Sequence, residues 1–261
     1  EAAALYVPLE DFFLRKSISI AISINSIETQ EDTALDFEPN NSEEEILSQI
    51  RHSSFVEDSF FILHKCMRRA CASRSYPIVC AVFNLITLSL AESIRPEIRN
   101  PLKEEEFSDE DIFLTMNNFE NAKRYLLQLK NEFDRLCDKI QIGESQKLKT
   151  ISSELTDISK ALQSDIDLIV NQYFMPKLQG IIHRAVAPLL NDDFITYDLY
   201  QEDYDDECEI FIEELIYYLD TQLQLYERSL TNPNWKRIGQ EAIQLLTNCL
   251  EAAAFQKSFT H

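Results

Sequence analysis

Apolar residues recur at helical spacing in two neighbouring stretches in the first third of the chain. Over 54–73 they follow one another at steps of four and three residues, which predicts a helix with one continuous apolar face. These positions are Val56, Phe60, Leu63, Met67 and Ala70. From Ile78 to Leu90 the chain is apolar nearly all round. A helix of that kind must be covered on several sides, so we predict that it lies at the centre of a helical packing unit.

Local breaks define the elements around this pair. Ser75 can act as an N-cap, and Pro77 is tolerated in the first turn of the second helix. A helix is predicted over 3–25, and Pro8 indicates that the residues before it end a preceding helix. The expected apolar side of the helix over 3–25 consists of Leu9, Phe12, Phe13, Ile18, Ile20 and Ile22. The acidic segment 27–53, with its run Glu43-Glu44-Glu45, is predicted to be a solvated loop.

The most regular apolar pattern lies in the middle of the chain and resembles a heptad seam over about four repeats. Its positions are Ile112, Met116, Phe119, Ala122, Leu126, Leu129, Phe133, Leu136 and Ile140. Ser108 or Asp109 can cap this helix, and Gly143 can end it. A similar stripe over 148–173 predicts a second arm, so the two helices should form an antiparallel hairpin. Pro176 should kink or end that arm before a continuation over 177–190.

The last third combines an acidic segment with two further helices. The segment 191–214 lacks the glycine and the ligand spacing of an EF-hand, so a solvated loop is predicted, with protein docking through its tyrosines as the alternative. Those tyrosines are Tyr197, Tyr200 and Tyr204. A helix over 206–230 and one capped by Asn234 should form another antiparallel pair. The apolar stripe of the helix over 206–230 consists of Phe211, Leu215, Tyr218, Leu219, Leu223, Tyr226 and Leu230. The apolar stripe of the last helix consists of Trp235, Ile238, Ala242, Leu245, Cys249 and Ala252.

These elements predict an all-α fold built as an elongated stack of antiparallel helix hairpins, a helical rod. Residues 1–103 are expected to form one helical bundle with the acidic loop 27–53. Residues 104–261 are expected to hold the long hairpin and the helix pair that starts a C-terminal bundle. The chain has only three glycines, which argues against β-sandwiches, barrels and phosphate-binding loops.

The formal net charge of −21 restricts the partners. Nucleic acid and anionic lipid would be repelled, whereas proteins with basic surfaces remain. We expect no signal peptide and no apolar span of 18 residues. The chain lacks a Met start and begins and ends within helical patterns, so a fragment of a longer protein is expected.

No catalytic motif is recognisable. The cysteines have no Cys-x-x-Cys spacing and are interpreted as buried thiols of a reducing compartment; they are Cys66, Cys71, Cys80, Cys137, Cys208 and Cys249. The histidines, His52, His64, His183 and His261, stand singly. His64 and Cys66 should point to different helix faces, and the adjacent Glu213 and Glu214 should diverge. We therefore predict no catalytic, cofactor-binding or metal-binding residues and no enzyme activity.

An ordered series of short matches resembles a known family. Its centre is Val56-Glu57-Asp58, Phe60-Phe61-Ile62, Lys65-Cys66, Arg69-Ala70, then Cys80-Ala81 and Asn84-Leu85. Further matches are Leu5-Tyr6-Val7, Glu10-Asp11-Phe12-Phe13, Arg15-Lys16, Leu114-Thr115-Met116-Asn117-Asn118, Leu250-Glu251 and Lys257-Ser258. The series resembles subunit 4 of the conserved oligomeric Golgi vesicle-tethering complex, in a divergent, fungal or other, member, over its middle to C-terminal part.

The resemblance implies a non-catalytic structural subunit of a helical-rod type shared among tethering complexes. It implies action in retrograde intra-Golgi transport, cytosolic and peripheral on Golgi membranes. The implied partners are other subunits of the complex and, through the full-length protein, SNAREs and their regulators, with no nucleic acid and no transmembrane segment. The alternative is a helical-repeat adaptor, HEAT-like or cullin-like; no period of roughly 35 to 45 residues is visible, which disfavours the former. An enzyme whose site a partner chain completes is a more distant alternative.

Overall fold

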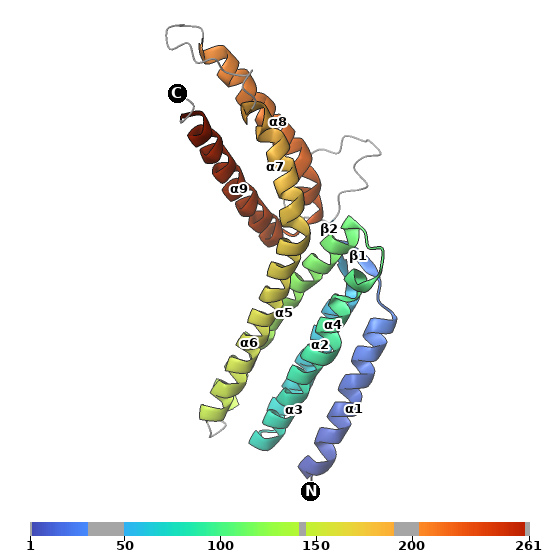
Figure 1. The fold of residues 1–261 in the computed structure, drawn as a ribbon. Coiled ribbons are helices and arrows are strands. Elements are labelled where there is room, and N and C mark those ends of the chain that lie inside the picture. Colours follow the sequence, from blue (N-terminus) through green and yellow to red (C-terminus); the bar gives the residue numbers. More distant parts are fainter. Residues whose placement is uncertain (1, 31–49, 141–144, 191–203, 259–261) are drawn as a thin grey trace, which may run out of the picture. The chain divides into compact units, whose positions relative to one another are not determined.

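The structure, a computed structural model, describes residues 2–30, 50–140, 145–190 and 204–258 and confirms the all-α prediction (Figure 1). The described helices are α1 (Ala2–Ser23), α2 (Ser54–Ala72), α3 (Tyr76–Ser89), α4 (Arg95–Ile98), α5 (Asp109–Ile140), α6 (Ser145–Ile169), α7 (Met175–Leu190), α8 (Tyr204–Ser229) and α9 (Asn232–Ser258). Shorter elements are strands β1 (Ile27–Gln30) and β2 (Ile50–Ser53), π-helices η2 (Leu90–Ile94) and η4 (Val170–Phe174), and the 3-10 helix η3 (Asn100–Lys103).

The described residues form two compact units. Those up to Asp167 belong to the first unit and those from Leu168 belong to the second, so the boundary falls in the last turn of α6. Helices α2 and α5 lie on opposite sides of the predicted division between 103 and 104, yet they pack together in the first unit. That division stays a prediction about domains.

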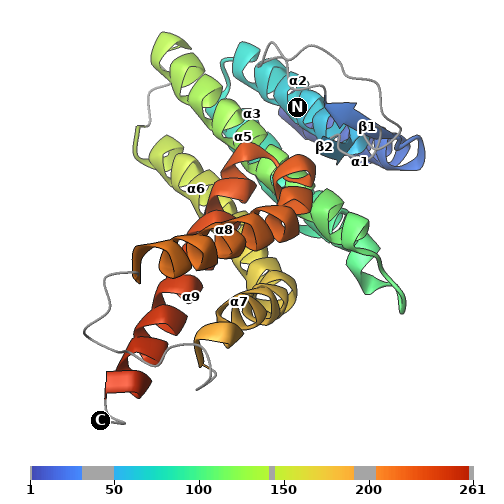
Figure 2. The same cartoon turned by 90° about the horizontal axis from the view of Figure 1, so that it is seen from above.

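The first unit begins with three helices that pack as antiparallel neighbours (Figures 1 and 2). The N–H of Ser54, at the start of α2, donates to the carbonyl of Ser26 just beyond the end of α1, at 2.9 Å. Between α2 and α3, Arg74 has a φ of 51°, the left-handed conformation that lets the chain reverse tightly. Pro77 lies in the first turn of α3 as predicted, but the Ser75 side chain makes no capping hydrogen bond.

Helix α1 buries a different face from the one predicted. Leu14, Ile18 and Ala21 are in the core, whereas most of the expected apolar side is exposed. The exposed apolar residues of α1 are Leu5, Leu9, Phe12, Phe13 and Ile20. The prediction was wrong because α1 is apolar on two opposite faces, and helical periodicity alone does not select which face is covered. Pro8 also lies inside this helix instead of ending an earlier one. Pro8 is exposed, so water can satisfy the carbonyl that lacks its usual N–H donor.

A short antiparallel ribbon replaces the two ends of the predicted loop 27–53. Ile27 pairs with Ser53 and Gln30 pairs with Ile50, and the residues between the strands lie outside the described part. Amide side chains of α5 hold β2: Asn118 Oδ1 accepts from the Ser53 N–H at 2.8 Å, and Asn117 Nδ2 donates to the Arg51 carbonyl at 3.2 Å. The ribbon therefore depends on contacts with a helix more than sixty residues away, which local propensity does not reveal.

The helical run Tyr76–Ile98 is the core element of the first unit. The run has 23 residues, and an 18-residue window within it has a mean hydropathy of 1.7, so it is long and apolar enough, by length and composition only, to cross a membrane. The expectation that the chain holds no such span was therefore wrong. In this structure its inward side chains are packed against protein, as in the core helix of a bundle. They are Ile78, Val79, Val82, Phe83, Ile86, Leu90, Ile94 and Ile98.

Pro176, which was expected to interrupt a helix, and Pro96 are each preceded by a short π-helix. Each π-helix ends one residue before a proline-containing turn: η2 before Arg95-Pro96, and η4 before Met175-Pro176. The Arg95 N–H donates to the Leu90 carbonyl, and the Met175 N–H donates to the Val170 carbonyl, five residues back in both cases. Proline removes a helical donor and crowds the carbonyl four residues earlier. A wider turn just before it lets the helical backbone continue.

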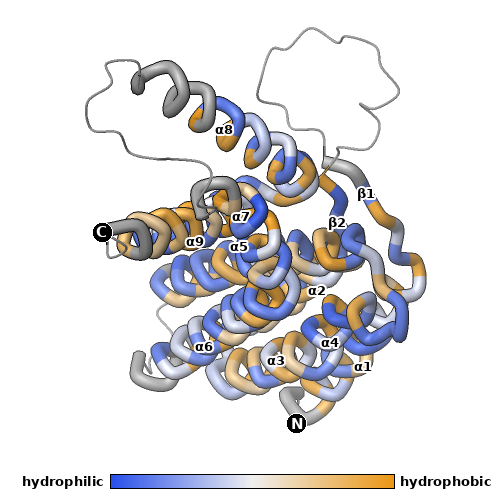
Figure 3. The backbone as a smooth tube through the Cα atoms, turned by 45° about the horizontal axis from the view of Figure 1, so that its top comes forward, coloured by the Kyte–Doolittle hydropathy of each residue, from blue (hydrophilic) through white to orange (hydrophobic). Residues whose placement is uncertain are grey.

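Helix α5 buries its predicted seam, but its main partner was not predicted. Met116, Phe119, Leu126, Leu129 and Phe133 are fully buried, in the apolar stripe that alternates with polar positions along α5 (Figure 3). The helix packs most extensively against α2. Contacting pairs keep a separation of 64 to 68 residues along both helices, so α2 and α5 run parallel.

The predicted hairpin of α5 and α6 is present as a looser pair. Lys123 Nζ donates to Gln163 Oε1 at 2.7 Å, and each of these residues lies twenty positions from Gly143, as an antiparallel hairpin centred there requires. Gly143 itself lies outside the described residues. The apolar stripe of α6 is buried at Ile151, Leu155, Leu162 and Ile166.

The N-terminus of α5 provides a test of helix capping. Ser108 Oγ accepts from the Asp111 N–H at 3.2 Å, and Asp111 Oδ2 accepts from the Ser108 N–H at 2.8 Å, a reciprocal capping pair. We expect Ser108→Ala to lower the free energy of unfolding by about 1 kcal/mol. Ser75→Ala is the matched control, because Ser75 precedes α3 without a side-chain cap. Chemical denaturation measures both, and equal effects would contradict this assignment.

In the second unit α7 packs against both α9 and α8. Phe174 and Tyr226 meet edge to face with ring centroids 5.6 Å apart. The predicted pairing of α8 with α9 is less extensive than the packing of α7 on α9. Helix α9 begins at Asn232, and the Thr231 carbonyl accepts from the Trp235 N–H at 2.8 Å, so Asn234 lies inside the helix and is not its cap. Tyr204 opens α8, whereas Tyr197 and Tyr200 lie outside the described residues.

Candidate functional site

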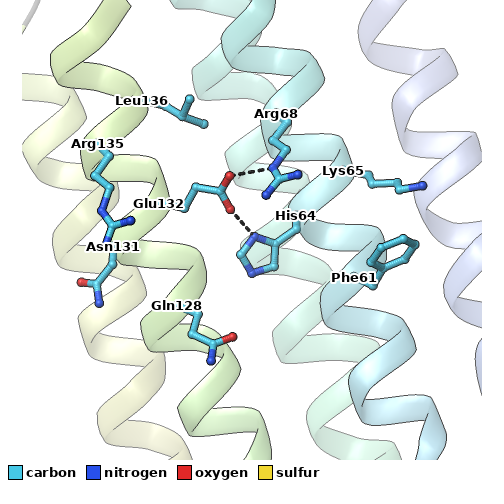
Figure 4. A pocket seen from close by; sticks show the side chains of 9 residues that line it. All are labelled: Phe61, His64, Lys65, Arg68, Gln128, Asn131, Glu132, Arg135 and Leu136. Atoms are coloured by element: carbon cyan, nitrogen blue, oxygen red, sulfur yellow. Dashed lines mark hydrogen bonds and ion pairs between the residues drawn. The ribbon is translucent and has the colours of Figure 1, made fainter.

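An open groove of about 630 Å³ lies between α2 and α5 in the first unit (Figure 4). The apolar faces of the two parallel helices point inward and are buried, for example at Leu63 on α2 and Leu129 on α5. The polar edges of the two helices form the groove. It is lined by Phe61, His64, Lys65, Arg68, Gln128, Asn131, Glu132, Arg135 and Leu136. The groove is thus a charged surface feature over a packed core.

Glu132 bridges the two helices at the centre of the groove (Figure 4). Its Oε2 lies 2.8 Å from His64 Nδ1, and its Oε1 accepts from Arg68 Nε at 2.6 Å. Burial raises the pKa of Glu132, but the hydrogen bonds from Arg68 and His64 outweigh burial and hold this pKa below its usual value. Glu132 is therefore a carboxylate at neutral pH, and it orients Arg68 instead of acting as a proton donor.

Positive charge exceeds negative charge along the groove. Lys65 Nζ lies 4.4 Å from the centroid of the Phe61 ring, and Arg135 is exposed. Among the described residues no carboxylate is paired with Arg135. Three cationic side chains thus line a groove that holds one carboxylate, in a chain with 24 Lys and Arg against 45 Asp and Glu.

The residues that the sequence singled out for possible chemistry do not converge. His64 lies in the groove, the His52 Nε2 lies 3.7 Å from the Glu28 carboxylate, and His183 is exposed on α7. Glu213 and Glu214 are exposed on α8, and His261 lies outside the described residues. Within the described ranges no three His, Cys, Asp or Glu side chains are arranged to hold a metal ion.

The described cysteines carry free thiols. They are Cys66, Cys71, Cys80, Cys137 and Cys249, whereas the side chain of Cys208 lies outside the described part. Cys66 and Cys71 are fully buried, and burial raises the pKa of Cys66 to about 12 and that of Cys71 to about 11. A thiol with so high a pKa is a poor nucleophile, so these side chains serve as core residues. Cys66 and His64 point to different surroundings, as predicted.

The sequence patterns did not reveal the groove. Arg68 and Glu132 meet across 64 residues of chain, and such a pairing leaves no local mark. The only signal was the concentration of basic residues at His64-Lys65 and Arg68-Arg69 in an otherwise acidic chain. Arg69 does not belong to the groove, because it lies one helical step further round α2 and pairs with α1.

A second group of polar side chains, which we call the Glu10 cluster, joins α1 to α2 through Arg69, Glu10 and Tyr6. Arg69 donates to both carboxylate oxygens of Glu10 at 2.7 Å, and the Tyr6 hydroxyl donates to Glu10 at 2.8 Å. The Arg69 guanidinium also lies 4.7 Å from the Phe13 ring centroid. Burial raises the pKa of Glu10, but the hydrogen bonds from Arg69 and Tyr6 outweigh it and bring this pKa below its usual value. Burial and Glu10 together raise the pKa of Tyr6 to about 12.

The Glu10 cluster predicts a pH-dependent contribution to stability. Because the pKa of Glu10 is lower in the folded state, its stabilising effect is present above the unfolded pKa of about 4.3 and is lost as the pH falls through the folded value. We expect Glu10→Gln to cost about 1.5 kcal/mol at pH 7 and much less at pH 3. Denaturation at both pH values measures this difference. Asp11→Asn, which removes an exposed pair with Arg15, is the control and should stay within about 0.5 kcal/mol.

The fold and the groove define a class of protein. The chain is an all-α helical-bundle protein, and its described part carries a charged groove between two parallel helices. Residues 2–100 match the family model described as "COG4 transport protein, middle alpha-helical bundle", and residues 112–261 match "Conserved oligomeric Golgi complex subunit 4, C-terminal". The chain belongs to the family of subunit 4 of the conserved oligomeric Golgi complex, which confirms the resemblance drawn from its short motifs.

Individual relatives agree with the family models. The chain is 24% identical to conserved oligomeric Golgi complex subunit 4 of Homo sapiens over 303 residues, covering 99% of this chain and 36% of the relative. It is 22% identical to the protein of that name from Arabidopsis thaliana, covering 98% of this chain and 34% of the relative. The chain thus spans about a third of the length of these relatives. No solved structure gives a significant match.

Proposed function

We propose that this chain is part of a non-catalytic structural subunit of the Golgi vesicle-tethering complex that acts in retrograde intra-Golgi transport. The observation that carries the proposal is the match to subunit 4 over nearly the whole chain, in relatives as distant from one another as Homo sapiens and Arabidopsis thaliana. The helical-repeat adaptor is not favoured, because both family models belong to the same subunit.

The proposed mode of action is the presentation of helical surfaces to other proteins. Long helices hold side chains in fixed positions at 1.5 Å per residue, so a surface on α5 keeps its geometry without bound ligands or metal. Other subunits of the complex are the proposed first partners, with SNAREs and their regulators reached through the full-length protein. The proposed location is cytosolic and peripheral on Golgi membranes.

Co-purification tests this proposal. The full-length protein, tagged at its own locus, should recover the other subunits of the tethering complex in constant proportions after washing at moderate salt. Its depletion should release vesicles that carry Golgi-resident proteins and fail to dock. Recovery of a different assembly without Golgi tether subunits would refute the proposal, and it would support the general adaptor instead.

A further inference from the structure

We propose that the groove between α2 and α5 binds an acidic segment of another protein, with carboxylates on Lys65, Arg68 and Arg135 and an apolar side chain on Phe61. The inference goes beyond the proposed function, because it concerns one binding surface and the chemistry of its ligand. It would hold for any assembly that contains this chain.

Charge complementarity is the first argument. The chain carries a net charge of −21, yet the groove has three cations and one carboxylate. Glu132 neutralises one of these cations, Arg68, with which it is paired, and its other oxygen is engaged by His64 (Figure 4). Two of the three cations, Lys65 and Arg135, therefore carry the excess positive charge. Among the described residues neither Arg135 nor Lys65 has a carboxylate partner. The Lys65 ammonium group lies over the Phe61 ring. These cations are available to an incoming acid.

Pre-organisation is the second argument. Glu132 fixes the Arg68 guanidinium through Nε at 2.6 Å, which leaves the other N–H groups of Arg68 free to donate. A guanidinium that is already oriented loses less side-chain freedom when a carboxylate binds. Arg68 is 64% exposed, so it can be reached from solvent.

The shape and lining of the groove favour a peptide over a membrane or a nucleic acid. The lining residues on α5 extend from Gln128 to Leu136, about 12 Å along the helix axis, which accommodates roughly two turns of a helix. Phe61 is 57% exposed and Leu136 lies at the opposite edge, so an apolar side chain of the ligand gains buried area there. A flat lipid surface does not enter a groove, and a nucleic acid much longer than the groove would extend beyond its cations over a chain with a net charge of −21.

Site-directed photo-crosslinking in cells identifies the ligand. Gln128 lines the groove and is exposed, so a benzoylphenylalanine at this position of the full-length protein reports on what occupies the groove. We expect one protein segment, sequenced by mass spectrometry, with several Asp or Glu residues and an apolar residue among them. A neutral or basic segment, a lipid adduct or no adduct would overturn the proposal.

Charge reversal tests whether the groove cations are responsible. Arg135→Glu should lower the crosslinking yield about fivefold, and should weaken binding of the sequenced segment, as a synthetic peptide, by a similar factor. Lys65→Glu with Arg135→Glu should weaken it about twentyfold or more. Lys16→Glu, at an exposed position on α1, makes a comparable change in net charge and should alter binding less than about twofold.

Two further measurements keep the outcome decisive. Circular dichroism should show unchanged helicity in all variants, because each altered side chain is on the surface.

Phosphatidylcholine vesicles with phosphatidylinositol 4-phosphate should not compete with the peptide. Competition that depends on Arg135 would replace the proposal by lipid binding, and equal losses in the Arg135 and Lys16 variants would show non-specific attraction. Recovery of tether subunits in the co-purification is independent of these results.

Discussion

Truncation of Phe133 to alanine is expected to be the most destabilising single change in the first unit, at about 4 kcal/mol. Phe133 is 1% exposed, and its ring centroid lies 4.1 Å from that of Phe83, so the change leaves a cavity between α5 and α3 and removes an aromatic contact. Urea unfolding of the chain, followed by circular dichroism, measures the loss of free energy.

Leu127→Ala is the matched control for this truncation. Leu127 lies on the same helix but is 57% exposed. Truncation of this side chain should therefore lower the free energy of unfolding by less than about 1 kcal/mol, because little apolar surface is buried there. Phe133→Leu should recover more than half of the stability, because it refills much of the cavity. If Phe133→Ala and Leu127→Ala were equally mild, α5 would not dock on the core as described.

Replacement of Asp165 by asparagine is expected to cost about 2 to 3 kcal/mol, the second-largest effect. Asp165 on α6 is 2% exposed and accepts from Arg95 at 2.6 and 2.9 Å and also from Arg99. The change leaves two guanidinium groups next to a buried neutral amide. Arg95 and Arg99 are 35% and 38% exposed, so water relieves part of this cost, and the expected value lies below that of a fully buried pair.

The control for Asp165 is Asp157→Asn on the same helix. Asp157 is 66% exposed and pairs with Lys160 three residues away, so its loss should stay within about 0.5 kcal/mol. Denaturant midpoints of the two variants, compared at neutral pH, measure the contrast. A loss below 1 kcal/mol for Asp165→Asn would mean that α6 does not depend on this ion pair for its docking.

Several features of this protein follow from local sequence alone. The spacing of Met116, Phe119 and Phe133 predicted the buried face of α5, and Ser108, one of its two predicted caps, lies at its start. Local hydrogen bonding and helical periodicity act within a few residues, so the sequence shows them directly. The same reasoning predicted the run from Ile78 to Leu90 as a core helix. It also predicted that the chain is built of helices.

The candidate site was not predictable in the same way. His64 and Arg68 looked like ordinary surface residues of a helix, and Glu132 occupied a polar position beside the apolar seam. Only the parallel docking of α2 on α5 brings them within hydrogen-bonding distance. The sequence had suggested antiparallel neighbours, because short connections join consecutive helices; α2 and α5 are not consecutive.

The sequence by itself determined which residues are helical and which stripe of α5 is apolar, since both depend on interactions between near neighbours. The tertiary structure decided which of two apolar faces of α1 is covered, where β1 and β2 pair, and which helix covers α5. It also decided where charges meet, as in Asp165 with Arg95 and Glu132 with Arg68. These outcomes depend on the docking of segments about twenty to seventy residues apart, which is governed by the summed burial and complementarity of whole surfaces and not by local pattern.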